Sequence, residues 1–454
     1  MSKENKNGTN RRNFLKTSVV SALGLSFAGA AMANGFEKET GEKRKYSNFA
    51  LFKKEYNNID NAYEISPDFE RMDQKNSRLL RDFWDPTVMD RGVVISFAAK
   101  SLHMVPNPNE GEPGYSKVDM ALAKASWAGH DAGTAGVSAL GIHNKGPLND
   151  WSALQPRPKK VSFESVQEAT KVVKRASNFY GADLVGIAPY DERWVYSKWY
   201  DAYDALYQRG PAIHSDAKMP FKPKSVIAVA FEMDYDAIKT PGALCDSAVG
   251  LEYSHMTEVT HKIAVFLNEL GYRAIPAGND IGLSIPTAIQ AGLGEQSRMG
   301  TLISKEYGSR VRLAKVYTDL ELVPDKPIRF GVEEFCEKCM KCADLCPSNA
   351  ISKDKKTSWE PKTTASASSH PGVKKWFQDS EKCVSQWEKT GVGCSVCLSV
   401  CPYNKLDTWV HDVAKIAVGV PVGRDIARQM DEAFGYGSIN AENVDKFWNK
   451  EINK

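Results

Sequence analysis

The chain of 454 residues is longer than one hydrophobic core usually supports, so two or three domains are expected. Its 42% hydrophobic and 25% charged residues are ordinary for a globular protein. The formal net charge of +3 is concentrated in the first 33 residues, so the rest of the chain carries no basic excess that would indicate a nucleic-acid partner.

The N-terminus reads NRRNFLKTSVVSALGLSFAGAAMANG, in which Arg11 and Arg12 precede an apolar run and the small residues Ala-Met-Ala. This order is typical of a secretory signal, and the paired arginines indicate the twin-arginine export route. The apolar run of 15 residues is too short to span a bilayer comfortably. We therefore expect residues 1–33 to be a signal peptide that is cleaved between Ala33 and Asn34. A basic tail before an amphipathic helix is the alternative.

Residues 34–60 are charged and weakly patterned, and we expect them to form a segment that wraps the surface. The region from there to about residue 160 is rich in Gly, Pro and Asn, as in MVPNPNEGEPG and LNDWSALQPRPKK, and is predicted to form loops between short elements. A helix follows, because apolar residues then recur at steps of three and four. It is predicted to end before Gly181, and a buried strand is expected over residues 184–188. The apolar residues that define this helix are Phe163, Val166, Ala169, Val173 and Ala176.

A second strand is expected over residues 226–231, and a second helix within SHMTEVTHKIAVFLNELGY, where Gly271 ends it. The stretches RAIPAGND and GSRVRLAKVYTDL each predict one further strand. Helices that alternate with strands indicate a three-layer α/β core. This core is expected to close before the cysteine-rich region that follows it.

Eight of the nine cysteines lie between residues 336 and 401. The first group, CEKCMKCADLCP, has the C-x2-C-x2-C-x3-C-P spacing of bacterial ferredoxins, whose fourth cysteine serves the other cluster. The second group ends in the same pattern, but its leading cysteine lies further upstream. The spacing predicts two [4Fe–4S] clusters. One is held by Cys336, Cys339, Cys342 and Cys401, and the other by Cys346, Cys383, Cys394 and Cys397.

Zinc ribbons and disulfides are the alternative interpretations of these cysteines. Zinc sites usually show two C-x2-C pairs, and disulfides need no such regular spacing. Cys245 is left over, and we expect it to be a buried structural thiol. The sequence has no glycine-rich nucleotide-binding motif, and its eight histidines show no pair spaced for a metal site, so we interpret each as a surface or core residue.

Several stretches together resemble the respiratory reductive dehalogenases, which are corrinoid enzymes that remove halogens from organohalides. These are the export motif RRNFLK, the block from EYSHMTEV to GEQSRMG, the run from EYGSRVRL to CADLCP, and the displaced second cysteine group. The resemblance covers nearly the whole chain. It implies an α/β (α+β) fold with a nitroreductase-like core that holds a base-off corrinoid of the cobalamin type. Base-off binding needs no protein histidine on cobalt, in agreement with the absence of an Asp-x-His-x-x-Gly motif.

The resemblance also implies a domain order. After the signal peptide 1–33 come an N-terminal region 34–222 and a corrinoid-binding core 223–330, which residues 403–454 complete. A ferredoxin-like module 331–402 with two clusters is inserted in this core. No residue that contacts the corrinoid can be named.

The implied function is that of the terminal reductase of organohalide respiration. The implied substrate is a small organohalide, for which a chloroalkane or a chloroethene is our expectation. The resemblance further implies that the protein lies on the outer face of the cytoplasmic membrane, attached through a small integral membrane protein. An upstream respiratory electron donor would supply its electrons.

Three residues carry over from the family by motif position. Tyr253 in LEYSHM matches the tyrosine that is proposed to deliver the proton, and Asn279 in PAGND and Arg312 in SRVRL match its polar partners. A phenol has a reference pKa of about 10 and is a weak acid at neutral pH, but a cation within a few Å lowers that pKa by roughly one to three units. An arginine can serve as that cation because it stays charged. The alternatives are a core tyrosine near a helix start and a surface arginine on a strand.

Two other functions stay open at this point. An enzyme of the epoxyqueuosine reductase type, which acts on tRNA, would have a similar corrinoid core and cluster module. The predicted export and the absence of a basic excess count against it. A ferredoxin-type electron-transfer subunit without a catalytic centre would contain about eight iron atoms and no cobalt.

Overall fold

The structure, a computed structural model, describes residues 53–88, 105–134, 150–202, 210–361, 367–406 and 436–450, with short pieces between these ranges. The predicted signal peptide lies outside the described residues, as does much of the C-terminal segment. The described residues belong to one compact unit, Ala50–Lys454, and the domain boundaries expected within it stay predictions. No helix among the described residues is long and apolar enough to cross a membrane.

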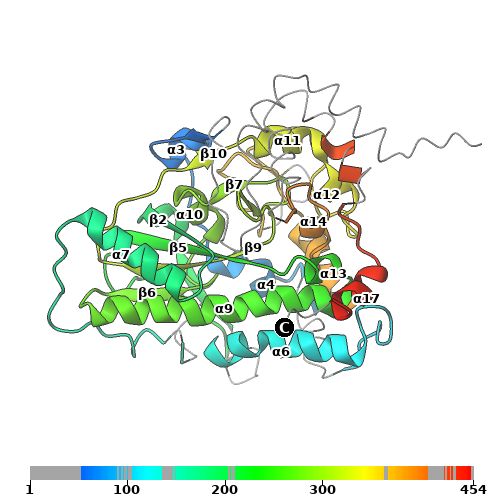
Figure 1. Cartoon of the computed structure of the whole chain (residues 1–454), viewed down its shortest axis with the longest axis horizontal. Coiled ribbons are helices and arrows are strands. Elements are labelled where there is room, and N and C mark those ends of the chain that lie inside the picture. Colours follow the sequence, from blue (N-terminus) through cyan, green and yellow to red (C-terminus); the bar gives the residue numbers. More distant parts are fainter. Residues whose placement is uncertain are drawn as a thin grey trace, which may run out of the picture. The chain divides into compact units, whose positions relative to one another are not determined.

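A four-stranded antiparallel sheet with the strand order β2-β5-β9-β6 forms the middle of the fold (Figure 1). Its strands are β2 (Leu184–Pro189), β5 (Ser225–Glu232), β9 (Val311–Thr318) and β6 (Ala274–Ala277). The sequence predicted all four of them. Every residue of β5 except the last is buried, which explains why this strand reads as a nearly continuous apolar run rather than an alternating one.

Helices cover both faces of this sheet. On one face lie α7 (Val166–Phe179) and α9 (Gly242–Glu269), and on the other lies α10 (Ser284–Gln290). Successive residues of a strand point to opposite faces. Ile227 of β5 therefore packs in the core under α9, whereas Ala228 packs in the core under α10. The fold thus has three layers, helix, sheet and helix.

Two helices differ from the sequence prediction. Residues Lys117–Thr134 form the 18-residue helix α6 in a region expected to be mostly loops. The Gly, Pro and Asn residues that suggested loops lie before and after this helix. Helix α9 begins at Gly242, well before the predicted start at Ser254. Residues 243–250 are all buried, so this part of α9 shows no alternation of apolar and polar residues that a periodicity search could detect.

Helix α6 lies alongside α9 (Figure 1). Two glycines permit this close approach. A Cβ on Gly133 of α6 would lie 2.6 Å from Thr257 Cγ2, and a Cβ on Gly250 of α9 would lie 2.5 Å from Trp127 Cδ1. Since both distances are shorter than van der Waals contact, any larger residue at these positions would force the facing side chains to shift.

Shorter elements surround this core. Three two-stranded sheets consist of β1 (Lys54–Glu55) with β10 (Ile328–Arg329), β3 (Lys198–Asp201) with β4 (Ile213–Asp216), and β7 (Gly294–Gln296) with β8 (Leu302–Ser304). The short helices are α3 (Ile59–Ala62), η1 (Gln74–Asn76), α4 (Arg78–Arg81), η4 (Glu192–Trp194), η5 (Ala237–Lys239), α11 (Val332–Cys339), α12 (Lys341–Asp344), α13 (Ser380–Thr390), α14 (Val396–Ser399) and α17 (Glu442–Trp448).

Candidate functional site

The eight cysteines of the predicted cluster module lie on or directly beside the four short helices α11 to α14. Electrostatic interactions between the thiols divide them into two sets. Cys342 also interacts with Cys397 of the other set, so the two sets are neighbours. The first set is Cys336, Cys339, Cys342 and Cys401, and the second is Cys346, Cys383, Cys394 and Cys397.

These are the two groups that the crossed-ligand spacing predicts, and the assignment of each group to one cluster stays a prediction. All nine cysteines are free, so the described structure contains no disulfide of the kind considered above. Cys245, expected to be a structural thiol, is buried on α9.

The chemistry of the two cysteine sets fits iron–sulfur clusters. Burial raises the pKa of Cys339 to about 11 and the pKa values of Cys383 and Cys401 to about 12, so these thiols ionise only beside a strong positive charge such as iron. No group of three or more potential ligands among the described residues is arranged around a single metal ion. A [4Fe–4S] cluster needs no such arrangement, because each of its four irons takes a different cysteine.

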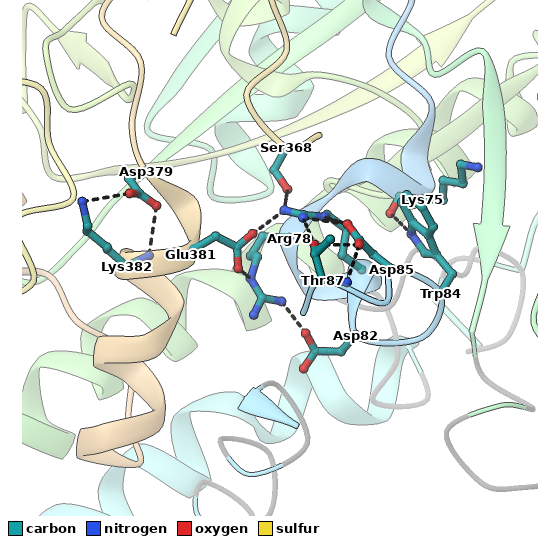
Figure 2. A network of polar contacts seen from close by, with 11 residues as sticks. Lys75, Arg78, Asp82, Trp84, Asp85, Thr87, Ser368, Asp379, Glu381 and Lys382 are labelled. Carbon is teal, nitrogen blue, oxygen red and sulfur yellow. Dashed lines mark hydrogen bonds and ion pairs between the residues drawn. The ribbon is translucent and has the colours of Figure 1, made fainter. Parts of the chain in front are cut away.

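Helix α13, which carries Cys383, is tied to α4 by buried ion pairs (Figure 2). Glu381 lies two residues before Cys383 and pairs with Arg78, at 2.5 Å between Oε2 and Nε, and with Arg81. Each arginine also pairs with an aspartate four residues further along the chain. The side chains of both arginines are only 4% exposed. The contact therefore fixes one cysteine-bearing helix against the N-terminal part of the fold.

Tyr253, Asn279 and Arg312 come from three different elements and meet at one place. Tyr253 lies in the middle of α9, not near a helix start, Asn279 follows β6, and Arg312 is the second residue of β9. Asn279 Nδ2 donates a hydrogen bond to the Tyr253 hydroxyl at 3.1 Å. The guanidinium carbon of Arg312 lies 5.7 Å from the centroid of the Tyr253 ring. Arg312 Nε is buried and has no hydrogen-bond partner among the described residues.

Two aromatic side chains from α6 cover the Tyr253 ring. Trp127 stacks on it with ring centroids 5.0 Å apart, and His130 meets it edge-on at 5.4 Å. Both escaped the sequence analysis, which interpreted His130 as a surface or core residue and assigned no tryptophan. Their spacing of three residues would have placed them on one face of a helix, but α6 itself was not predicted.

Ser254, the residue after Tyr253, holds α6 in this position. Its hydroxyl accepts a hydrogen bond from the His130 N–H at 3.0 Å and donates one to the Ser126 carbonyl at 2.6 Å. In a regular helix this N–H and this carbonyl would bond to each other. The serine hydroxyl therefore bridges a donor and an acceptor of one turn of α6 and fixes Trp127 and His130 relative to Tyr253.

Helix α9 also connects this site to the second cysteine set. The carboxylate of Asp246 accepts hydrogen bonds from Trp127 Nε1 at 3.1 Å and from the backbone N–H of Gly393 at 3.2 Å. Gly393 directly precedes Cys394. Burial raises the pKa of Asp246, whereas these two hydrogen bonds oppose that effect. The Asp246 side chain thus contacts both Trp127, which stacks on Tyr253, and the cluster module.

Two cavities adjoin α6. A small one of about 30 Å³ lies beside Tyr253 and is bounded also by His130, Thr257 and Asn279; it has room for about one water molecule. A larger one of about 790 Å³ lies on another face of α6, next to Met120. None of the three candidate catalytic residues lines the larger cavity.

Comparisons with known proteins support the cluster module and the resemblance to reductive dehalogenases. Residues 335–404 match a family model described as a 4Fe-4S double cluster binding domain. The tetrachloroethene reductive dehalogenases of Desulfitobacterium hafniense and of Dehalobacter restrictus (strain DSM 9455 / PER-K23) are each 36% identical to this chain, over 97% of this chain and 98% of the relative.

A solved structure has a similar fold. The catabolic reductive dehalogenase NpRdhA superposes with a TM-score of 0.61 at 22% sequence identity, over 85% of this chain and 49% of the other. This chain therefore matches about half the length of that protein.

Proposed function

The chain belongs to the reductive dehalogenase family, and from this membership we propose that it replaces a carbon-bound halogen by hydrogen. The reaction takes an organohalide, two electrons and one proton, and releases the reduced organic product and a halide ion. The observation that carries the proposal is the meeting of Tyr253, Asn279 and Arg312 beside a module for two 4Fe-4S clusters. It combines a proton donor, a fixed cation and a source of electrons.

The cofactors of this function are two [4Fe–4S] clusters and a corrinoid. We assign the clusters to the two cysteine sets, whose thiols lie close together in fours. When bound, the corrinoid supplies the cobalt chemistry that brings the electrons to the carbon–halogen bond. The cavity of about 30 Å³ beside Tyr253 is far too small for a corrinoid, so we name no residues that hold it.

The protein's own residues manage the proton and the halide. The Tyr253 hydroxyl donates a proton to carbon, a role in which a positioned donor typically contributes about 10²–10⁴ in rate. Arg312 places a permanent positive charge near the phenolate that remains. Its buried Nε, which has no other partner in the described structure, can donate to the departing halide. Trp127 covers one face of the phenol and excludes water from it.

For the substrate we propose a small chlorinated alkane or ethene. The relatives that are similar over nearly the whole chain are named for tetrachloroethene. This name describes those proteins and supports only the class of substrate here.

For the location we propose export by the twin-arginine route to the outer face of the cytoplasmic membrane. The Arg11–Arg12 pair and the apolar run that follows it support the export. Peripheral attachment through a small integral membrane protein and electron supply from an upstream respiratory donor complete the proposal.

Two alternative functions are less well supported. Whole-chain similarity to dehalogenases disfavours an enzyme of the epoxyqueuosine reductase type. The tyrosine, asparagine and arginine that meet next to the cluster module would have no purpose in a subunit that only transfers electrons.

One experiment tests the proposal against both alternatives. The holoenzyme, with about eight iron atoms and one cobalt per chain, is supplied with a strong low-potential reductant and assayed for halide release from a chloroalkane, a chloroethene and a haloaromatic compound. We expect release of chloride from a small aliphatic substrate, and no release from protein that lacks the corrinoid. The absence of halide from all three classes would refute the proposal, and turnover of epoxyqueuosine in tRNA would replace it with the first alternative.

A further inference from the structure

A chain of hydrogen bonds leads from a buried lysine to Tyr253. Lys315 Nζ donates to Ser284 Oγ at 2.9 Å, Ser284 Oγ donates to Asn279 Oδ1 at 2.9 Å, and Asn279 Nδ2 donates to the Tyr253 hydroxyl at 3.1 Å. Lys315 also donates to the Gly278 carbonyl at 2.5 Å. No role in the reaction proposed above has been given to Lys315 or Ser284.

The chain runs around the edge of the central sheet. Lys315 lies on β9 and interacts with Ser284, the first residue of α10, on the face that α10 covers. Tyr253 belongs to α9 on the opposite face. Asn279 can join the two because it follows β6, the strand at the sheet edge. The chain therefore connects the catalytic tyrosine with a residue from the other layer of the fold.

The residues around Lys315 leave room for a long buried side chain. Its partners across the sheet are the small residues Ala228 and Ala277, and its own exposure is 1%. Burial lowers the pKa of Lys315 to about 8, while the nearby carboxylate of Asp280 acts to raise it. No other charged group among the described residues is known to act on it. Lys315 is therefore an ammonium at neutral pH, and Asp280 favours that form.

The charge on Lys315 sets the direction of every bond in the chain. An ammonium group has three donors and no acceptor, so the oxygen of Ser284 must accept from Lys315. The single serine proton then goes to Asn279 Oδ1 at 2.9 Å rather than to the Gly278 carbonyl at 3.4 Å. Because Oδ1 of Asn279 is occupied on this side, its NH2 group faces Tyr253.

The orientation of this amide decides what the phenol can do with its own proton. With the NH2 group toward Tyr253, the phenol oxygen accepts a hydrogen bond and its O–H is left free for a reacting carbon. A reversed amide would present its oxygen to Tyr253 and would hold that proton. The nitrogen and oxygen of an amide are nearly identical in shape, so only the hydrogen-bond partners fix the orientation.

We propose that Lys315 and Ser284 are positioning residues that keep the Asn279 amide turned so that it donates to Tyr253 and leaves the Tyr253 proton for the substrate. This inference rests on the proposed function, because it assigns Tyr253 the role of proton donor. It adds two residues to that function, neither of which touches the substrate.

The test compares Ser284→Ala with Ser284→Thr in the holoenzyme. Ser284→Ala removes the link in the middle of the chain, and we expect kcat to fall about five- to tenfold with little change in KM, as the loss of one oriented hydrogen bond predicts. Ser284→Thr keeps the hydroxyl and should retain most of the activity. Thr287→Ala removes a hydroxyl from the same helix whose partner among the described residues is the Leu283 carbonyl, and it should leave kcat unchanged.

Lys315→Met tests the charge at the head of the chain. In the wild type, kcat should decrease as pH rises past about 8, because a neutral Lys315 can accept a hydrogen bond from Ser284 and no longer fixes the amide. In Lys315→Met, kcat should be low at all pH values and this decrease should be absent. The iron and cobalt contents of each variant, measured alongside, should equal those of the wild type.

A readout without turnover separates this inference from the proposed function. In protein labelled with 13Cζ-tyrosine, the Tyr253 signal is identified by its absence in Tyr253→Phe. Its chemical shift should differ between Ser284→Ala and the wild type at one pH, because the phenol loses an oriented hydrogen-bond donor, and Ser284→Thr should keep the wild-type value. An unchanged chemical shift together with an unchanged kcat would overturn the inference, as would equal losses in Ser284→Ala and Ser284→Thr. If the wild type releases no halide, the proposed function fails, while the chemical shift still decides whether the chain acts on Tyr253.

Discussion

At the scale of single residues, the hydroxyl of Tyr253 can be separated from its ring. The ring packs against Trp127 and His130 of α6, whereas the hydroxyl accepts a hydrogen bond from Asn279. Tyr253→Phe keeps the ring contacts and removes only the proton donor. We expect turnover to be abolished with iron and cobalt contents unchanged, as measured by halide release and metal analysis.

A suitable control is Tyr272→Phe, which removes a hydroxyl that bonds to the Val161 carbonyl at the surface. It should leave turnover unchanged. Near-normal activity of Tyr253→Phe would exclude Tyr253 from the mechanism.

A second residue makes stability depend on pH. Glu295 on β7 is fully buried and accepts a hydrogen bond from the Phe330 N–H. Burial raises the pKa of Glu295 from 4.5 to about 7, and the attraction of Arg329 at 3.5 Å does not compensate. Between these two values the folded chain keeps a proton that the unfolded chain has lost. The free energy of unfolding therefore decreases as pH rises through this window.

We expect Glu295→Gln to remove this decrease, which amounts to at most about 3 kcal/mol for a shift of this size. The measurement is the midpoint of thermal unfolding from pH 5 to pH 8, at constant iron content. The variant should lose less stability over this range than the wild type. Parallel curves for the two proteins would show that Glu295 does not titrate in this window.

At the scale of elements, the ion pairs between α4 and α13 lead to a specific prediction. Glu381 bridges Arg78 and Arg81, and both arginines are buried (Figure 2). Glu381→Ala would remove this bridge and leave each arginine paired with its aspartate within α4 and the turn after it. Each charge-assisted hydrogen bond that is lost contributes roughly 1.5–3 kcal/mol. We expect a lower unfolding midpoint and less iron per chain, because α13 carries Cys383 of the second set.

The neighbouring residue supplies the control for this prediction. Lys382 forms an ion pair with Asp379 and its side chain is 52% exposed. Lys382→Ala should change stability by no more than about 1 kcal/mol. If Glu381→Ala and Lys382→Ala have the same unfolding midpoint and iron content, the ion pairs of Glu381 do not hold α13 in place.

The elements also show how far sequence reasoning reached. Strands β2 and β5 were predicted because short apolar runs between turn residues are typical of buried strands. Helix α6 was missed because the surrounding Gly, Pro and Asn residues dominated the interpretation of that region. The first part of α9 was missed because it is buried on all sides and has no polar face. Periodicity detects only elements with two different faces.

The same limit applies to the site. The cysteine sets could be written down from spacing, and Tyr253, Asn279 and Arg312 from family motifs. Trp127, Ser284 and Lys315 follow only from contacts between elements that are far apart in the sequence. A lysine within a predicted strand, such as Lys315, is normally interpreted as facing solvent. Only the order of the strands in the sheet shows that it lies in the interior.

At the scale of the whole molecule, the proposed export depends on a few residues at the N-terminus. Replacement of both Arg11 and Arg12 by lysine should block twin-arginine export, because that route reads the arginine pair. We expect the uncleaved precursor to accumulate inside the cell, measured by fractionation and by N-terminal analysis. The exported wild type should begin at Asn34. Export of the double variant at the normal level would argue for a different route.

Helix α9 carries Asp246, which contacts the cluster module, and Tyr253 seven residues later on the same face. The distance between Asp246 and Tyr253 is therefore set by the seven-residue step between them, which is about 10.5 Å along the axis of α9. One inserted residue between them would turn Tyr253 by about 100° away from Asn279. A change in the length of this part of α9 would therefore move Tyr253 relative to the cluster module that Asp246 contacts. An alanine inserted after Gly250 should therefore leave the iron content normal and abolish halide release.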